Sequence, residues 1–504
     1  MRLPKILDCE PRVGDEPRTL FKDENIWVVH KPAGWLTHQD GNHARPCVTD
    51  WCNEPMGIHQ RLDVDTTGVL VMSRTRLGAQ NLQAAFESRR VKKTYLAIVD
   101  AWHGPKRGTM DQAMPPPGRA PAETRFQVQR RSPHGIVLEL QPVTGRTHQI
   151  RYHLAQQGHP IRGDGRYGDA LDRRAWRTLL HCAEISLPDG QCWTSPPPAD
   201  FGLALGRGPH SLRSDLQQDP RTTCYREIHG EGDGLPGVYI DRYGDWLWIQ
   251  QDVDTHAYEL PENKGVYTTF GQQDRSRGGQ VKPRLTSGIA APKDLAVLEH
   301  GVRYRVQLGD QLSTGLFLDQ RPQRTWLAQH GAGLRVLNTF AHAGGFSIAA
   351  ATAGAETVSL DLSRSWLERI PLQLADHQIS TEGHDWIYGD VFQWMPRLAK
   401  RGERFDLVIL DPPSTSVGKK KKRWSARADY PELVRLAVSL LNPGGHLWTS
   451  TNHRGISPHH FARLVRKGAP SAVLERVCPP ATDFPCVGPP NQKTFVWQWP
   501  GART

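Results

Sequence analysis

The chain has 504 residues, too many for one hydrophobic core, because single cores stop growing at roughly 250–300 residues. Its 38% hydrophobic and 23% charged residues are typical of a soluble globular protein and exclude wholesale disorder. No segment approaches the roughly 18 apolar residues of a membrane helix, and charges and prolines interrupt the N-terminus before a signal-peptide core forms, so we expect a cytoplasmic protein.

The net charge and the cysteines narrow the function classes. Lys and Arg number 63 against 52 Asp and Glu, which gives a net charge of +11. Such a surplus suits a polyanionic partner such as nucleic acid, although a merely basic soluble protein fits the charge equally well. The eight cysteines include no C-x-x-C pair, which argues against a zinc site and against a secreted disulfide framework. We therefore expect no metal.

The first half of the chain mixes short β-rich runs with helical patches, the order of an α+β domain. A run rich in Pro, Gly and Ser between Ser195 and Asp219 lacks sustained periodicity and is typical of a linker. We therefore expect a domain over residues 1–205 and a linker over residues 206–221. The expected strands of this domain lie within residues 25–34, 68–74, 94–102 and 135–143.

Three polar segments of this domain could carry chemistry. Asp63 lies beside an Arg just ahead of an apolar strand, where a carboxylate can be an ion-paired nucleophile, although alone it is more typical of turn capping. Tyr95 lies at the start of another apolar strand and alone is more typical of a half-buried strand aromatic. Residues 144–164 crowd Arg and His, including Arg151, and could equally be a solvated basic face.

Together, five motifs resemble the pseudouridine synthases of the RluA-like family. They occur in that family's order and at its spacing: HKPAGWLTH, QRLDVDTTG, KKTYLAIV, TGRTHQIRYHLAQQGHPIRGDGRYG and LLHCAEISL. The resemblance covers about residues 20–205. It implies the pseudouridine synthase fold and the conversion of uridine to pseudouridine without a cofactor.

The resemblance also implies a role for each polar residue. Asp63 would be the essential aspartate that acts on the target uridine, Arg151 would pair with its carboxylate, and Tyr95 would line the pocket and serve a later proton transfer. The implied reaction cleaves the N1 glycosidic bond, rotates the uracil and reattaches it through C5. An arginine partner keeps a carboxylate ionised in a closed pocket, and the target base must leave its stack to reach that pocket.

Downstream, the pattern changes twice. Residues 222–300 form a smaller block, in which a strand–turn–strand pattern over residues 231–250 leads us to expect a small α+β accessory domain that binds RNA. From about residue 302, strand-like and helix-like runs alternate, which is typical of a parallel, doubly wound, Rossmann-like sheet. We expect this last domain over residues 301–504.

The alternating half has the layout of a cofactor site. Its first strand contains Asn338 and runs into a turn where Gly344 permits a sharp entry into a helix, and the next strand ends at Asp361. A glycine-rich turn followed by an acidic strand end is how such folds hold ribose hydroxyls, although an ordinary helix-start turn looks similar. Asp390 and Asp411 come at the ends of the third and fourth strands.

The Asp-Pro-Pro motif at Asp411, with the two acidic strand ends before it, resembles class I S-adenosylmethionine-dependent methyltransferases. The absence of G-x-G-x-x-G and of a Walker lysine argues against dinucleotides and nucleoside triphosphates. The resemblance implies S-adenosylmethionine as the cofactor, with Asp361 on its ribose, Asp390 near its adenine and Gly344 beside its methionine part. Asp411 would lie beside the reactive methyl group, and we include Asn338 in the expected cofactor site.

A closer resemblance covers about residues 222–499. EGDGLPGVYIDRYGDWLWIQ, TGLFLDQR and VLNTFAHAGGFS resemble large-subunit rRNA methyltransferases of the cytosine-C5 type and their relatives. LDLSRSWLER, DPPSTS and TSTNHRG look most like the guanine-N7 methyltransferase domain of the bifunctional 23S rRNA methyltransferase. Cytosine C5 needs a Cys thiolate that adds to C6, whereas guanine N7 is an exposed lone pair that needs only positioning. Because no Cys lies between Cys224 and Cys478, we favour the nitrogen target, with Asn452 as a base-edge contact or, equally, a turn residue.

A basic run follows the Asp-Pro-Pro loop directly. Such a run is usually a solvated face, but its place beside the expected active site favours a phosphate-binding flap. The sequence thus predicts a bifunctional enzyme that isomerises uridine and methylates a base in 23S rRNA. Alternatively, one silent half could serve as an RNA-docking platform in ribosome assembly, or the substrate could be transfer RNA. The residues of the basic run are Lys419, Lys420, Lys421, Lys422 and Arg423.

Overall fold

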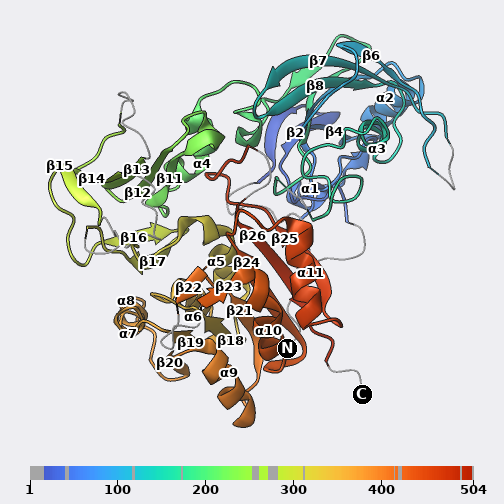
Figure 1. Ribbon diagram of the computed structural model, residues 1–504. Coiled ribbons are helices and arrows are strands. Elements are labelled where there is room, and N and C mark those ends of the chain that lie inside the picture. Colours follow the sequence, from blue (N-terminus) through green and yellow to red (C-terminus); the bar gives the residue numbers. More distant parts are fainter. Residues whose placement is uncertain are drawn as a thin grey trace. The chain divides into compact units, whose positions relative to one another are not determined.

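The chain forms two compact units, with the division between Leu212 and Arg213. Figure 1 labels the elements of both units. In the described part of the chain, no helix has the length and apolar character needed to cross a membrane. The computed structural model describes residues 16–39, 45–115, 120–171, 174–251, 260–270, 282–309, 313–413, 415–417, 423–487 and 491–501.

The first unit is built on one mixed sheet. Its ten described strands follow the order β1-β2-β4-β9-β5-β8-β7-β6, with β3 beside β4 and β10 beside β9. The strands are β1 (Arg18–Lys22), β2 (Ile26–Lys31), β3 (Gly57–Ile58), β4 (Thr67–Ser73), β5 (Lys92–Val99), β6 (Arg107–Met110), β7 (Thr124–Ser132), β8 (Gly135–Pro142), β9 (Leu180–Ser186) and β10 (Cys192–Thr194). The helices are α1 (Val48–Trp51), α2 (Arg76–Glu87) and α3 (Gln149–Gln156).

The central strands of this sheet are apolar along most of their length. Every residue of β2 and β4 is buried, which requires cover on both faces of the sheet. The longest helix, α2, begins after Thr75, whose hydroxyl accepts a hydrogen bond from the backbone N–H of Gly78. The four strands predicted from the sequence correspond to β2, β4, β5 and β8, so these predictions are confirmed.

The Pro-, Gly- and Ser-rich run between Ser195 and Asp219 contains three short helices, two of which lie in the expected linker over residues 206–221. These are η1 (Ala199–Phe201), η2 (Pro209–Leu212) and α4 (Ser214–Gln218). Phe201 is fully buried in the core of the first unit, and Arg213 is fully buried within the second. The prolines and glycines here therefore mark turns between packed helices rather than an extended tether.

The second unit begins with a small sheet. Its strands β12 and β13 are antiparallel neighbours, so the predicted strand–turn–strand is confirmed. Between residues 222 and 300, the described part contains the short 3-10 helix η3 (Gly230–Asp233) and no α-helix, in place of the α+β mixture expected. The sheet follows the order β11 (Cys224–His229), β12 (Val238–Tyr243), β13 (Trp246–Gln251), β14 (Gly265–Phe270) and β15 (Arg284–Gly288), and β16 (Ala296–Glu299) pairs with β17 (Val302–Arg305).

The rest of the second unit is a doubly wound sheet. Its seven described strands follow the order β20-β19-β18-β21-β24-β26-β25. In Figure 1, α9, α10 and α11 lie on one side of this sheet, and α5, α6 and α8 on the other. The strands are β18 (Arg335–Thr339), β19 (Glu356–Asp361), β20 (His384–Tyr388), β21 (Phe405–Leu410), β24 (Leu441–Thr451), β25 (Val473–Cys478) and β26 (Lys493–Gln498). Around them lie η5 (Leu318–Gln320), α5 (Arg321–His330), α6 (Gly345–Thr352), α7 (Arg364–Leu367), α8 (Ile370–Asp376), α9 (Val391–Lys400), α10 (Ala426–Val438), α11 (Pro458–Gly468) and the paired strands β22 (Thr415–Val417) and β23 (Arg423–Ser425).

The strand directions decide where a ligand can bind. The five strands from β20 to β24 are parallel, as predicted, whereas β26 is antiparallel to both of its neighbours. The chain winds outward in both directions from β18, so the carboxyl ends of β18, β19 and β21 meet at one edge. In open α/β sheets, ligands bind at such a switch point.

Candidate active sites

A cavity in the first unit brings the predicted pseudouridine synthase residues together. It has a volume of about 430 Å³, and Asp63, Tyr95 and Arg151 are among the residues that line it. Asp63 lies in the loop before β4, Tyr95 in β5 and Arg151 in α3. Because β9 lies between β4 and β5 in the sheet, segments far apart in the sequence meet in one cleft.

Arg151 forms a direct ion pair with Asp63 and is itself fixed by a buried carboxylate. Its NH1 donates to Asp63 Oδ2 at 2.9 Å, while its Nε and NH2 donate to the two carboxylate oxygens of Asp164 at 2.7 and 2.9 Å. The Asp164 side chain is 0% exposed and also accepts the backbone N–H groups of Arg166 and Tyr167. Although burial opposes its ionisation, the hydrogen bonds from Arg151 hold the pKa of Asp164 below its usual range. Sequence reasoning missed Asp164, which lies in the quoted GDGRYG motif.

His148 contacts the second oxygen of Asp63. Its Nε2 is 3.6 Å from Asp63 Oδ1, and its Nδ1 is 3.3 Å from the Tyr167 hydroxyl. Burial lowers the pKa of His148, so the imidazole is neutral at physiological pH. His148 also has a φ of +55° just before α3, a backbone conformation that is uncommon in residues other than glycine and that clusters at functional sites. It is a second site residue that sequence reasoning did not single out.

Tyr95 contributes a protonated phenol to the wall of this cavity. The residue is only 9% exposed. Burial raises its pKa well above the usual range of a tyrosine, and the nearby Cys182 and Asp63 act in the same direction. The hydroxyl is therefore protonated at neutral pH, and it can take part in proton transfer only as a donor or as a transient relay.

A buried lysine anchors the loop that carries Asp63. Lys31 is 0% exposed, and its Nζ donates to the backbone carbonyls of Pro32, Trp35 and Val64 at 3.0, 2.7 and 3.1 Å. Val64 directly follows Asp63 in the chain. The lysine of the HKPAG motif thus ties β2 to the loop that carries Asp63.

In the second unit, two predicted cofactor residues lie at the carboxyl ends of neighbouring strands. Asp361 ends β19, and its carboxylate accepts the backbone N–H groups of His342 and Ser363 at 2.9 and 2.7 Å. Burial raises the pKa of Asp361, and these hydrogen bonds oppose the rise. Asp390 follows β20 and caps α9 by accepting the Phe392 N–H at 2.9 Å. Both residues are half-buried.

The turn between β18 and α6 is tight and requires a glycine. Gly344 has a φ of +82°, and a Cβ at this position would lie 2.6 Å from the Ile370 side chain. Phe340 and His342 have φ values of +56° and +51°, which is strained for residues other than glycine. With Asp361 beside this turn, the residues present fit a nucleoside-containing cofactor, because a carboxylate accepts from hydroxyl groups.

Asn338 lies deeper than the sequence analysis placed it. It is 1% exposed, and its Nδ2 donates to the Ser347 hydroxyl at 2.9 Å. That hydroxyl is in turn 2.7 Å from the hydroxyl of Ser359. These groups tie β18, α6 and β19 together. Asn338 therefore supports the turn between β18 and α6 from within the core instead of contacting a ligand directly.

Asp411 and Asn452 lie at the same edge of the sheet. Asp411 follows β21, and its Oδ2 accepts a hydrogen bond from Gln320 Nε2 at 3.1 Å. Burial, and then the negative charge of Asp319, raise the pKa of Asp411 to about 7. Asn452 directly follows β24, the strand beside β21, and is exposed. Sequence reasoning did not single out Asp319 or Gln320, although both lie in the quoted TGLFLDQR motif.

The predicted phosphate-binding flap falls mostly outside the described residues. This holds for Lys419, Lys420, Lys421 and Lys422, and of Arg423 only the backbone is described, at the start of β23. Among the residues that the structure does describe, no three His, Cys, Asp or Glu side chains are grouped as metal ligands, and the seven cysteines are free.

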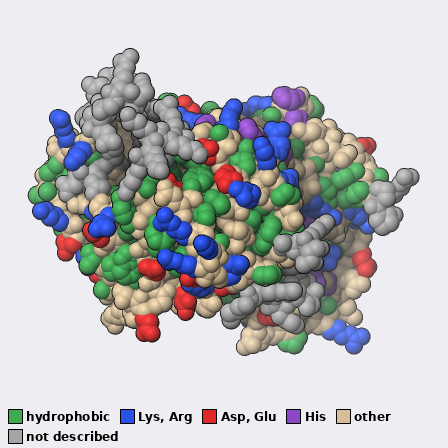
Figure 2. Space-filling view, turned by 60° about the horizontal axis from the view of Figure 1, so that its bottom comes forward, with side chains coloured by type: hydrophobic (Ala, Val, Ile, Leu, Met, Phe, Trp, Pro, Cys, Tyr) green, Lys and Arg blue, Asp and Glu red, His purple; other side chains and the backbone are tan. Residues whose placement is uncertain are grey.

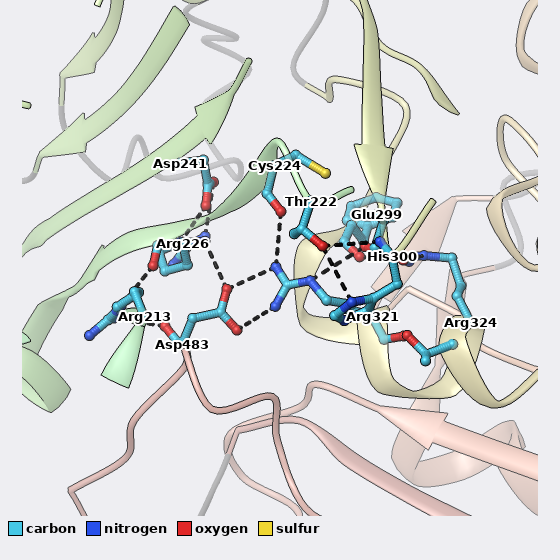
Figure 3. Close-up of polar contacts among 12 residues, drawn as sticks. Arg213, Thr222, Cys224, Arg226, Asp241, Glu299, His300, Arg321, Arg324 and Asp483 are labelled. Atoms are coloured by element: carbon cyan, nitrogen blue, oxygen red, sulfur yellow. Dashed lines mark hydrogen bonds and ion pairs between the residues drawn. The ribbon is translucent and has the colours of Figure 1, made fainter. Parts of the chain in front are cut away.

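A buried ion-pair network joins the small sheet of the second unit to the doubly wound one (Figure 3). Arg321 donates to both carboxylate oxygens of Asp483 at 2.7 and 2.9 Å, and the same carboxylate accepts the backbone N–H of Arg226 at 2.8 Å. Arg324 forms a bidentate pair with Glu299 at 2.8 and 2.6 Å. Because Arg321 directly follows η5, the network also fixes the segment that contacts Asp411.

Comparison with known proteins gives two family matches. The RNA pseudouridylate synthase family matches residues 25–156, and the S-adenosylmethionine-dependent methyltransferase family matches residues 275–496. The putative ribosomal RNA large subunit methyltransferase YwbD of Bacillus subtilis is 34% identical over 265 residues, which cover 50% of this chain and 67% of that protein. Ribosomal RNA large subunit methyltransferase I of Cronobacter sakazakii is 31% identical over 321 residues, which cover 60% and 81%.

A solved structure agrees with these matches. The crystal structure of SMU.776, a putative methyltransferase complexed with SAH, is 26% identical with a TM-score of 0.53, over 62% of this chain and 86% of that one. The chain is therefore an enzyme with a pseudouridylate synthase domain and a methyltransferase domain, it acts on RNA, and S-adenosylmethionine is the cofactor of its second domain. It belongs to the S-adenosylmethionine-dependent methyltransferase family that includes the ribosomal RNA large subunit methyltransferases I, and it carries an RNA pseudouridylate synthase domain in front of the methyltransferase.

Proposed function

We propose that this chain modifies 23S ribosomal RNA twice, by isomerising a uridine to pseudouridine and by methylating a guanine at N7. The observation that carries the proposal is that each half presents its own set of reactive groups. Asp63 is ion-paired with Arg151 in the cavity of the first unit, and Asp361 and Asp411 lie at the carboxyl ends of β19 and β21, the two strands on either side of β18 in the second. The names of the relatives, which are large-subunit rRNA methyltransferases, support the substrate class.

In the first unit, Asp63 is ion-paired in the cavity that would receive a flipped uridine. Arg151 stays cationic because Asp164 is bound to two of its N–H groups, so it stabilises negative charge on Asp63. Asp63 then acts on the target while the N1 glycosidic bond breaks, the uracil rotates, and C5 joins the ribose. The proton on C5 must finally leave for solvent, and we assign the Tyr95 hydroxyl of the cavity wall to this step as a relay, which takes the C5 proton as it gives up its own.

In the second unit, S-adenosylmethionine supplies the methyl group. The residues of the chain need only hold the acceptor nitrogen in line with it, because N7 of guanine is a lone pair that loses no proton on methylation. Asn452, exposed at the end of β24, would contact the base edge, and the run from Lys419 to Arg423 would hold phosphates.

Cysteine placement separates a nitrogen target from a carbon target. Cys224 and Cys478 are buried, and burial raises the pKa of Cys224, which makes it a poor nucleophile. Cys486 is half-buried and lies within electrostatic range of Lys493, whose Nζ donates to the His453 carbonyl beside Asn452. We expect Cys486→Ser to retain full methylation. Loss of methylation in this variant would refute the N7 assignment and favour a thiolate-dependent carbon target.

The surface charge fits an extended RNA substrate. On the face shown in Figure 2, Lys and Arg side chains lie in several small groups, with Asp and Glu among them. Scattered cations suit several separate phosphate contacts, and each contact releases counterions on binding. RNA affinity should therefore fall steeply as the salt concentration rises.

The test is nucleoside mass spectrometry of rRNA from a strain without the gene, with chemical labelling of pseudouridine because isomerisation leaves the mass unchanged. Full-length Asp63→Ala and Asp361→Ala variants are then used for complementation. We expect the first variant to restore only the methylguanine and the second to restore only the pseudouridine. Loss of a single mark in the deletion strain would make the other half a docking platform, and marks missing from transfer RNA would refute the ribosomal substrate.

A further inference from the structure

Two carboxylates from distant segments come within electrostatic reach of each other at the carboxyl edge of the doubly wound sheet. Asp411 follows β21, and Asp319 lies in η5. After burial, the charge of Asp319 is the largest cause of the raised pKa of Asp411, and burial also raises the pKa of Asp319. The intervening contact is the hydrogen bond from Gln320 to Asp411. Two like charges held in one half-buried place destabilise each other unless a cation is also present.

The fixed cations near this pair are engaged elsewhere. Arg226 and Arg324 are the arginines whose charges act on Asp319. Figure 3 shows Arg226 bound to Asp241, and Arg324 forms its bidentate pair with Glu299. Over the described ranges of the chain, neither Asp319 nor Asp411 forms an ion pair with a Lys or Arg side chain. The Lys and Arg residues that form ion pairs there all do so with other carboxylates; they are Lys22, Arg74, Arg125, Arg151, Arg162, Arg174, Arg177, Arg213, Arg221, Arg226, Arg242, Lys264, Arg305, Arg321, Arg324, Arg335 and Arg435.

A buried amide next to the pair also has an unused acceptor. Gln320 is 3% exposed, and its Nε2 lies against the Asp411 carboxylate. Its Oε1 is buried and has no hydrogen-bond partner in the described structure. An unpaired buried acceptor costs free energy. The unpaired Gln320 oxygen and the two carboxylates without a cation therefore both indicate that the ligand brings a positively charged or hydrogen-donating group.

We propose that Asp319 is a second carboxylate of the methyl-transfer site, and that Asp319 and Asp411 together face the positively charged sulfonium of S-adenosylmethionine. The inference rests on the proposed position of Asp411 beside the reactive methyl group. The sulfonium charge is present in S-adenosylmethionine and absent from S-adenosylhomocysteine, because the methyl group leaves as a cation equivalent and the sulfur becomes neutral. The pair therefore favours the reactive form of the cofactor over its product, and it stabilises the positive charge while that charge passes to the base.

The ionisation of Asp319 and Asp411 should be linked to the binding of S-adenosylmethionine. A bound cation favours the ionised form of both carboxylates, so binding of S-adenosylmethionine should release protons near neutral pH and should tighten as the pH rises through about 7. Binding of the neutral-sulfur product should show a smaller pH dependence. The other charged or titratable groups that act on the two carboxylates are Arg226, Asp241, Arg324 and Tyr430.

The test is calorimetric binding of each cofactor form to the full chain at about pH 8, where both carboxylates are ionised when a cation is present. We expect Asp319→Asn to weaken S-adenosylmethionine about tenfold and S-adenosylhomocysteine less than about twofold. Asp319→Glu keeps the charge and should recover most of the affinity. Asp385→Asn, which removes an exposed carboxylate at the start of β20, is the matched control and should change neither.

Equal weakening of both cofactor forms would overturn the proposal, because Asp319 would then hold the amino-acid part that the two forms share. Unchanged affinity in Asp319→Asn would overturn it as well. The RNA substrate plays no part in this experiment. A failure here therefore leaves the proposed nucleotide specificity standing, and an error in that specificity leaves this result standing.

Discussion

Replacing Asp164 by Asn tests whether the Asp63–Arg151 pair depends on the buried carboxylate behind it. Asn keeps the shape of Asp164, and its Oδ1 can still accept the backbone N–H groups of Arg166 and Tyr167. At the other position, the amide NH₂ would oppose the Nε–H of Arg151, which donates to Asp164 at 2.7 Å. One charge-assisted hydrogen bond is lost, and the guanidinium keeps only Asp63 as a charged partner.

The expected cost follows from the burial of the pair. A hydrogen bond to a charged group contributes about 1.5–3 kcal/mol, and removing one partner of a buried ion pair costs about 3–5 kcal/mol. The Arg151 side chain is 10% exposed and retains Asp63, so we expect a loss of about 3 kcal/mol in the free energy of unfolding of the first unit. That is a large share of the roughly 5–15 kcal/mol of a typical domain.

The assay is urea unfolding of the full chain, with the transition of the second unit as the internal reference, together with tritium release from uridine labelled at C5. Because the pKa of Asp164 is lowered in the folded state, its contribution is present above its ordinary pKa of about 3.9 and is lost as the pH falls through the lower folded value. The difference between the wild type and the variant should therefore shrink only below about pH 4. A loss under about 1 kcal/mol with unchanged tritium release would refute the reasoning.

Three further predictions concern the rest of the site. Tyr95→Phe should lower the unfolding free energy by no more than about 1.5 kcal/mol, because one buried hydrogen bond to Cys182 is lost. It should slow pseudouridine formation about 10²–10⁴-fold, and labelled-uridine turnover that stays normal would exclude a role in proton transfer. Asp361→Ala should weaken S-adenosylmethionine binding at least about a hundredfold in equilibrium dialysis, because the proposed ribose acceptor and the bond to His342 are removed. Wild-type affinity in this variant would contradict the proposed role. Asp483→Asn should lower the unfolding free energy of the second unit by about 3–5 kcal/mol in denaturant titration, because it breaks the buried ion pair with Arg321. The control is Glu475→Gln, which removes a half-exposed carboxylate.

The first site could be read from the sequence because its motifs are local and ordered. Asp63, Tyr95 and Arg151 stand in short segments with recognisable neighbours, and the structure brings all three to one cavity. The roles of His148 and Asp164 could not be read in the same way. His148 matters through its left-handed backbone and Asp164 through a bidentate contact, and both are properties of the folded chain.

In the second half, periodicity predicted the parallel strands but not the antiparallel ones. β25 and β26 are separated by a stretch rich in proline, and the antiparallel direction of β26 depends on where the chain returns to β24. Asp319 was missed for a related reason. Its effect on Asp411 depends on the contact that η5 makes with Asp411 through Gln320, which no local pattern encodes.

The ion pairs of Figure 3 also determine how this enzyme can be divided. The sequence suggests a cut after residue 300, yet Arg324 is 3% exposed and depends on Glu299, on the other side of that cut. A fragment that began at residue 301 would contain a buried arginine with no carboxylate to neutralise it, and such an uncompensated charge is strongly destabilising. A transplantable methyltransferase module must therefore include the strands in front of it and start at Arg213, so gene fusion or truncation can succeed at that junction and not at the later one.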